Sequence, residues 1–339
     1  MKILFIGGTG TISSACAQLA VERGFELTLL NRGRQAACPG ARQIVADISN
    51  PAATAATLGR ERWDVVVDYI AFKPEELEQR IDLFRGRTGQ FIFISSASAY
   101  QKPLTHFPIT ESTPVVNPYW DYSRNKIACE ERLLRALQEE RFPATIIRPS
   151  WTYNERRITV PVNSDKSFTV VDRMRRGLPV IVPGDGTSLW TMTHNSDFSK
   201  GLVGLLGHQG AIGHAFHITS DEVLTWNQIY EAVAHAAGVG QPRLVHIASD
   251  FITACLPQFS GGLLGDKSHS GVFDNTKIKR FVPDFVATTR FRDGIARSVK
   301  WFDADPARQQ VDAVANAAWD RLIAGYEQGL QSTLKALEG

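Results

Sequence analysis

The chain has 339 residues, of which 43% are hydrophobic and 21% charged, and its formal net charge is +2. This is the composition of a globular protein with a sizeable core, and the length suits one large α/β domain or two lobes. The charges are dispersed, which disfavours nucleic acid or a membrane surface as partner and favours a small-molecule ligand. The four cysteines form no C-x-x-C pair, so neither a zinc site nor a disulfide framework is predicted, and a reducing cytoplasm is expected.

The first 150 residues alternate between short apolar runs and helical patterns. Strands are predicted at residues 2–6, 26–32, 43–47, 63–71, 90–98 and 144–150, and helices after the glycines near residue 10 and over 74–86 and 123–140. The first apolar run is too short for a signal peptide or a transmembrane helix. The alternation predicts an α/β fold with a doubly wound parallel sheet that is buried on both faces.

After residue 150 this rhythm breaks, and prolines and glycines become frequent. We expect a dinucleotide-binding domain over 1–150 with return segments near 185–220, and a smaller substrate lobe over 151–184 and 221–339. Ligands are then expected at the carboxyl ends of the strands, between the lobes. The tail spaces Val314, Ala318, Leu322, Tyr326 and Leu330 like one helix face, which predicts a C-terminal helix packed on the body.

The segment "FIGGTGTISS" places Gly7, Gly10 and Ser13 at the G-x-x-G-x-x-G spacing, with Ser13 in place of the last glycine. It lies between the first predicted strand and the first helix. In this context the N–H groups at a helix N-terminus can cradle a pyrophosphate. A dinucleotide site is therefore predicted, and the alternative is a plain glycine turn.

The second predicted strand ends in Asn31, followed by Arg32 and Arg34, where dinucleotide-binding folds usually place an acidic residue for the ribose 2′-hydroxyl. Guanidinium groups attract a 2′-phosphate, so NADP is favoured over NAD. NAD stays open because Asn31 can bind a free hydroxyl, and the arginines can also belong to a solvated turn. Asp47 and Ile48 are predicted to flank the adenine, with a helix cap as the alternative reading of Asp47.

Two tyrosines precede a lysine by four residues. After Tyr69, Lys73 is followed directly by Pro74, which disfavours helical geometry at that lysine. Tyr122 and Lys126 begin a proline-free helical pattern, so both side chains are predicted on one helix face. Lys126 can then favour the phenolate of Tyr122, whose unperturbed pKa of about 10 would make it a poor base at neutral pH.

These motifs together resemble the extended short-chain dehydrogenase/reductase superfamily, in its NAD-dependent epimerase/dehydratase group. The residues that carry the resemblance are the "GGTGTIS" turn, "FISSASAY", the Tyr122–Lys126 pair and "GDG" followed by "TH" and Asp197. The resemblance implies that Ser96 holds the substrate oxygen, that Tyr122 is the general acid/base and that Lys126 lowers the tyrosine pKa and binds the nicotinamide ribose. It also implies a homodimer built through two helices per subunit and a structural hydrogen bond at His194.

The predicted dinucleotide contacts combine the glycine turn, the strand ends and the resemblance. Tyr69 is expected to line the cofactor cleft with Ile70 and Ala71 rather than to act in catalysis. The residues predicted to bind the dinucleotide are Gly7, Thr9, Gly10, Thr11, Ile12, Asn31, Arg32, Arg34, Asp47, Ile48, Tyr69, Ile70, Ala71, Ser95, Tyr122, Lys126 and Pro149. No His, Asp or Glu grouping has metal-site spacing, so no metal is predicted.

The sequence departs from the family pattern where nucleotide sugars bind. Trp190 stands where such relatives place an arginine for the diphosphate, and Trp151 replaces an asparagine after the sixth strand. An indole offers one neutral donor and cannot balance a diphosphate. These changes favour a smaller, non-nucleotide substrate that contacts Ser98, Trp151 and Trp190, although either tryptophan can instead be core.

The leading functional hypothesis is an NADP-preferring oxidoreductase that acts on a hydroxyl or carbonyl group through Ser96, Tyr122 and Lys126. One alternative is a nucleotide-sugar epimerase or dehydratase with retained NAD; dehydration is disfavoured because Ala97, Ser98 and Ala99 supply no acidic residue. Another is a catalytically degenerate NAD(P)- or RNA-binding protein like the chloroplast stem-loop-binding branch. The segment 258–275 is left open between a substrate lid and a surface loop.

Overall fold

The structure is a computed structural model that describes residues 1–36 and 38–338. The chain forms two compact units. Unit 1 comprises residues 1–153, 191–221 and 272–288, and unit 2 comprises residues 154–190, 222–271 and 289–339. The segment 272–288, which the sequence analysis assigned to the substrate lobe, lies in unit 1.

Unit 1 contains a seven-stranded parallel sheet in the order β11-β6-β5-β4-β1-β2-β3. Strands β1 to β6 follow the spatial order β3-β2-β1-β4-β5-β6 of a doubly wound fold, which confirms the predicted fold class. The central strands β1, β4, β5 and β6 are buried on both faces, as expected of strands covered by helices, whereas the edge strand β3 is mostly exposed. The strands are β1 (Lys2–Ile6), β2 (Glu26–Asn31), β3 (Arg42–Val45), β4 (Trp63–Asp68), β5 (Thr88–Ile94), β6 (Ala144–Pro149) and β11 (Ala215–Ile218).

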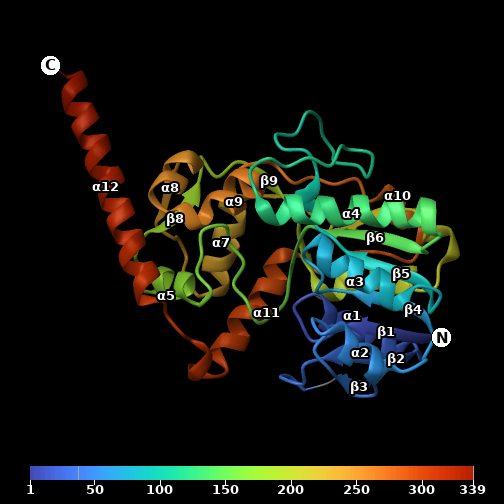
Figure 1. The fold of residues 1–339 in the computed structure, drawn as a ribbon. Helices are drawn as coiled ribbons and strands as arrows, with labels where there is room; N and C mark the ends of the chain where they lie inside the picture. The colour runs from blue at the N-terminus through green and yellow to red at the C-terminus, as the bar shows by residue number, and fades with distance from the viewer. Residues whose placement is uncertain (37, 339) are drawn as a thin grey trace. The chain divides into compact units, whose positions relative to one another are not determined.

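Helices cover both faces of this sheet (Figure 1). One core packs α1 (Ser13–Glu22), α6 (Asn195–Leu205) and α10 (Thr276–Phe281) against side chains such as Phe5 and Phe216. The opposite core packs α2 (Pro51–Leu58), α3 (Pro74–Phe84) and α4 (Asp121–Glu140) against Phe91 and Ile146. A short parallel pair, β7 (Trp151–Tyr153) and β10 (Met192–His194), also belongs to unit 1.

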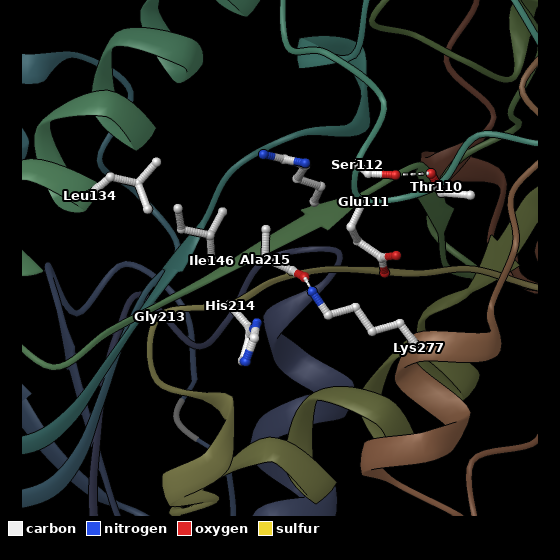
Figure 2. Close-up of a pocket in the computed structure, with 10 residues that line it drawn as sticks. Thr110, Glu111, Ser112, Leu134, Ile146, Gly213, His214, Ala215 and Lys277 are labelled. Carbon is white, nitrogen blue, oxygen red and sulfur yellow. Dashed lines mark hydrogen bonds between the residues drawn. The ribbon is translucent and has the colours of Figure 1, made fainter.

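The edge strand β11 has its outward backbone groups bonded by charged side chains. Lys277 Nζ donates to the carbonyl of Ala215 at 2.9 Å, and the N–H of His217 donates to Glu111 Oε1 at 3.3 Å. Figure 2 shows Lys277, Glu111 and His214 gathered at this edge, where they line a cavity of about 420 Å³. Charged side chains at a sheet edge oppose the addition of another strand.

Unit 2 is built from short strand pairs and helices. β8 (Val180–Pro183) pairs in parallel with β13 (Leu244–Ile247), and β9 (Leu189–Trp190) pairs antiparallel with β12 (Leu224–Thr225). The segment left open between lid and loop forms short helical turns over Ser260–Gly262 and Leu263–Lys267. The longer helices are α5 (Thr169–Arg175), α7 (Trp226–Ala236), α8 (Ser249–Cys255), α11 (Phe291–Asp303) and α12 (Ala313–Leu337).

The predicted packing face of the C-terminal helix is correct in its middle and wrong at its two ends. Val314 and Leu330 of α12 are 80% and 52% exposed, whereas Trp319, Leu322 and Ile323 are buried. Ala318 and Tyr326 are half-buried, and the Tyr326 ring packs edge-on against Phe251 of α8 with ring centroids 5.6 Å apart. Within the described residues, no helix is long and apolar enough to cross a membrane.

Candidate cofactor and catalytic site

A cavity of about 790 Å³ lies in unit 1 at the carboxyl ends of the central strands. The glycine turn, the end of β2, the turn after β3 and the loop after β4 form its walls. Of the predicted dinucleotide contacts, the cavity brings together Gly7, Thr9, Gly10, Thr11, Ile12, Asn31, Arg32, Arg34, Asp47, Ile48, Tyr69 and Ile70. It adds Gly8, Ser13, Leu30, Gln35, Ala46, Ser49, Phe72, Glu76, Arg80 and Ile94, and its lining does not include the predicted contacts Ala71, Ser95, Tyr122, Lys126 and Pro149.

The glycine turn has a backbone that side chains would obstruct. Gly7 has φ +107°, and a Cβ there would lie 3.4 Å from the side chains of Tyr69 and Ile70. Gly8 has φ +99°, and its Cβ would lie 2.6 Å from Leu29 Cδ2. L-residues rarely adopt such angles, so glycine is required here. Because Ile12 provides no side-chain cap for α1, the N–H groups of this helix end suit a pyrophosphate.

The end of β2 presents an unpaired donor to the cavity. Asn31 Oδ1 accepts from Gly33 N and from Gln43 Nε2, both at 2.8 Å. Its Nδ2 is buried and has no hydrogen-bond partner among the described residues. A buried donor without a partner is costly, so a ribose hydroxyl or 2′-phosphate oxygen fits at this point.

Positive and negative charge meet beside Asn31. Arg32 and Arg34 are exposed and line the cavity with Asp47. The pKa of the Asp47 carboxyl lies below its ordinary value because it accepts hydrogen bonds from the Ser49 side chain and backbone, with a smaller contribution from the two arginines. Asp47 is therefore ionised at neutral pH and partly offsets the positive charge.

A buried ion pair supports the loop after β4, and the sequence analysis did not single it out. Asp68 Oδ1 accepts from the N–H groups of Ile70 and Ala71 at 2.8 and 2.9 Å, and Oδ2 accepts from Arg80 Nε at 3.2 Å. Burial raises the pKa of Asp68 despite the nearby guanidinium. Arg80 also donates to the carbonyl of Ile48 at 3.1 Å, so it ties two walls of the cavity together. The sequence feature that could have indicated this pair is Arg80, a charged residue within the apolar face of α3.

Tyr69 and Lys73 do not share a helix face, as the sequence predicted. Tyr69 follows β4 and packs edge-on against Phe5 with ring centroids 5.3 Å apart, and burial raises its pKa well above the ordinary value. Lys73 is exposed and precedes α3, which begins at Pro74. The spacing of this pair is therefore coincidental.

Lys126 is almost fully buried, one turn after the half-buried Tyr122 on α4. Its ammonium donates to the carbonyl oxygens of Ala71 at 2.7 Å and Ile94 at 2.8 Å, and it lies 6.0 Å from the centroid of the Tyr122 ring. Burial lowers the pKa of Lys126 to about 8. Two of its three donors serve the protein backbone, and the ammonium also lies 4.4 and 4.7 Å from the ring centroids of Phe72 and Phe93.

The serines after β5 belong to two different networks. Ser95 is buried, and its hydroxyl donates to Glu130, which also forms a bidentate pair with Arg148. Ser96 is half-buried, and its hydroxyl lies 2.9 Å from that of Ser98. The Glu130–Arg148 pair was not foreseen, because it joins α4 to β6 across 18 residues.

The two tryptophans predicted to contact substrate lie in different units. Trp151 is half-buried in β7, two residues after Pro149, which ends β6 in a buried position. Trp190 is 2% exposed in unit 2, where it stacks on Trp226 with centroids 5.0 Å apart and donates to the carbonyl of His269 at 2.9 Å. Its indole is thus core of unit 2.

His194 forms the structural hydrogen bond that was expected. Its Nδ1 lies 2.7 Å from Ser196 Oγ and also accepts from the Ser196 backbone N–H, which caps α6. Within the described ranges, no group of three or more His, Cys, Asp or Glu side chains could hold a metal ion.

Comparison with known proteins places this geometry in a family context. A profile described as NAD dependent epimerase/dehydratase family matches residues 3–219. The chain is 28% identical over 264 residues to the chloroplast stem-loop binding protein of 41 kDa b of Arabidopsis thaliana, covering 72% of this chain and 65% of that protein. It is 24% identical over 242 residues to the 2′-dehydrokanamycin reductase of Streptomyces kanamyceticus, covering 70% and 67%. The chain thus spans about two thirds of these relatives.

Solved structures show the same fold at low identity. Pal from Bacillus thuringiensis has a TM-score of 0.72 at 17% identity and covers 90% of this chain and 99% of its own. The UDP-glucuronic acid 4-epimerase of Bacillus cereus, solved in complex with NAD, has a TM-score of 0.70 at 18% identity and covers 91% and 100%.

Proposed function

The chain belongs to the NAD dependent epimerase/dehydratase family, and from this premise we propose that it is an NADP-preferring oxidoreductase of the short-chain dehydrogenase/reductase type. The observation that carries the proposal is a buried Lys126 one turn from a half-buried Tyr122, with its ammonium bonded to Ala71, in the loop that follows β4 beside the dinucleotide-sized cavity. The substrate is a small, non-nucleotide hydroxyl or carbonyl compound.

The proposed mechanism assigns one task to each of three side chains. The dinucleotide supplies or accepts a hydride at its nicotinamide ring when bound. Tyr122 exchanges a proton with the substrate oxygen, and Ser96 donates a hydrogen bond to that oxygen as negative charge develops on it. With a dinucleotide bound, Lys126 would donate its third N–H to the nicotinamide ribose, and its charge would stabilise the phenolate of Tyr122.

NADP preference rests on the end of the cavity near β2. Arg32 and Arg34 supply two guanidinium groups, and Asn31 Nδ2 supplies a buried donor. Calorimetric titration of cofactor-free protein should show tighter binding of NADPH than of NADH. Arg32→Ala should reduce that difference about tenfold while leaving NADH affinity unchanged. Equal affinities for the two cofactors in the wild type would contradict the preference.

The substrate assignment rests on the missing arginine at position 190 and on the aromatic residue at position 151. The Streptomyces relative, named as a reductase, supports a carbonyl substrate. The substrate assignment is tested by a screen of non-nucleotide aldehydes, ketones and amino-sugar ketones, in which the absorbance of NADPH reports turnover. Turnover that requires Tyr122 is the expected result, and no turnover with any member would argue against the assignment.

A nucleotide-sugar epimerase with retained NAD is the second candidate, favoured by fold neighbours solved with such substrates. It predicts that NAD is released when the purified protein is denatured and that UDP-glucose binds with micromolar affinity.

The Arabidopsis relative suggests a third candidate, RNA binding, which a gel shift with a steep salt dependence would support. Light scattering tests the expected homodimer.

A further inference from the structure

We propose that Ser98 and Ser123 are positioning residues that make Ser96 a dedicated hydrogen-bond donor to the substrate oxygen; this inference rests on the proposed function. The three hydroxyls form a chain. Ser123 Oγ donates to Ser98 Oγ at 2.8 Å, and Ser98 Oγ lies 2.9 Å from Ser96 Oγ. The backbone N–H of Ser98 also donates to Ser96 Oγ at 3.2 Å.

Counting protons along this chain gives it a direction. Ser98 Oγ accepts the hydrogen bond that Ser123 donates. Its own hydrogen therefore points to Ser96 Oγ, the one acceptor that the described residues of the protein offer it. Ser96 Oγ then accepts two hydrogen bonds, from the hydroxyl and from the N–H of Ser98. A serine hydroxyl has two lone pairs and one proton, so Ser96 can only donate to a further partner.

The series of three hydroxyls begins at a buried residue, Ser123, and ends at a partly accessible one, Ser96. Ser123 and Ser98 are 0% and 3% exposed, whereas Ser96 is half-buried at the end of β5. Asn117 holds the Ser98 backbone by donating to its carbonyl oxygen at 2.8 Å. Reorientation of the two buried hydroxyls would leave polar atoms unpaired, which opposes reversal of the chain.

The chain also joins the two elements that carry the proposed catalytic groups. Ser123 directly follows Tyr122 on α4, and Ser98 lies in the short helical turn Ala97–Ala99 after β5. Hydroxyls that accept one hydrogen bond become better donors for the next, so each bond along the chain strengthens Ser96 as a donor. Such a donor binds an alkoxide-like oxygen more strongly than a neutral one, which lowers the reaction barrier.

The test is a double-mutant cycle between Ser123 and Ser96. The probe reaction is NADPH-dependent reduction of 9,10-phenanthrenequinone, an activated diketone, followed at 340 nm. Ser123→Ala should lower kcat about three- to tenfold with little change in NADPH affinity. In the Ser96→Ala background the same change should have no further effect, because Ser123 acts only through Ser96. Ser123→Thr, which keeps the hydroxyl, should restore most of the activity.

Ser199→Ala is the matched control, because Ser199 is a buried serine of unit 1 whose hydroxyl, among the described residues, bonds only to the backbone of its own helix. It should leave kcat unchanged. If Tyr122→Phe is inactive, the proposed function stands. In that case, additive losses in Ser123→Ala and Ser96→Ala, or full activity in Ser123→Ala, would overturn the inference about the serines. Full activity in Tyr122→Phe, or a wild type that reduces no carbonyl probe, would overturn the proposed function and the inference with it.

Discussion

Lys126 of α4 donates a hydrogen bond from its ammonium to the carbonyl oxygen of Ala71 at 2.7 Å. The lysine proposed to act in catalysis therefore also holds the loop after β4, which forms one wall of the cavity proposed to bind the cofactor. Its second bond, to the carbonyl of Ile94, fixes the end of β5 just before Ser96. The buried ammonium of Lys126 thus connects α4, which carries Tyr122, with the loop after β4 and with the end of β5.

The buried charge of Lys126 should make stability depend on pH. Its pKa is lowered from 10.5 to about 8 in the folded protein, so between pH 8 and 10.5 the unfolded chain binds more protons than the folded one. Unfolding free energy should therefore rise with pH across this window, by up to ~1.4 kcal/mol per pH unit from this group. Below pH 8 the cost of burying the charge is fully present.

Lys126→Met checks this prediction by urea unfolding at pH 7.5 and 10. The wild type should gain stability relative to the variant as pH rises, because only the wild type loses the buried charge. An identical pH dependence in both proteins would show that Lys126 is not responsible. At neutral pH we expect a small net difference, since Met removes the charge and leaves the carbonyl oxygens of Ala71 and Ile94 without donors.

The Asp68–Arg80 pair should be essential for stability. Asp68→Ala leaves Arg80 buried without its counter-charge and two N–H groups without their acceptor, so a loss of about 3–5 kcal/mol is expected. Denaturant unfolding measures this loss. Asp82→Ala is the matched control, because Asp82 lies in an exposed ion pair on the same helix, and it should cost under about 1 kcal/mol.

Two glycines of the turn should respond differently to alanine. Gly8→Ala meets both a positive φ and a 2.6 Å approach to Leu29, so it should destabilise the fold by about 3 kcal/mol. Gly10 has an ordinary φ, and an added Cβ meets only Ser13 Oγ at 3.4 Å. Gly10→Ala should therefore keep thermal stability but weaken NADPH binding at least tenfold. Thermal unfolding and calorimetry separate the two effects, and normal NADPH affinity in Gly10→Ala would argue against pyrophosphate at this turn.

Asp47 should limit the affinity for NADPH. Its carboxylate is ionised beside Arg32 and Arg34, so Asp47→Asn removes negative charge near the proposed 2′-phosphate. We expect NADPH to bind a few-fold more tightly, with little change for NADH, and the difference should shrink at high salt. Weaker NADPH binding in the variant would instead indicate that Asp47 contacts the adenosine directly.

Much of the nucleotide-binding half could be predicted from the sequence because its signals are local. Neighbouring residues suffice to recognise the strand–glycine turn–helix pattern and the apolar strands. They also suffice to distinguish the two Tyr-x-x-x-Lys pairs, because Pro74 directly follows Lys73. The same locality explains the prediction of Asn31, Arg32 and Arg34 at the cavity, since the end of a strand next to a glycine turn has a fixed place in a doubly wound sheet.

The sequence by itself thus determined the fold class, the family and the position of the cavity that we propose to hold the cofactor. Only the tertiary structure decided which charges are buried and paired, as Asp68 with Arg80 and Glu130 with Arg148, because these contacts join separate elements. It likewise showed Trp190 as core of unit 2 and the C-terminal helix as largely exposed, since burial depends on what packs around a residue and not on its own type. The direction of the serine chain also required three dimensions, because Ser98 and Ser123 are 25 residues apart and hydrogen-bonded.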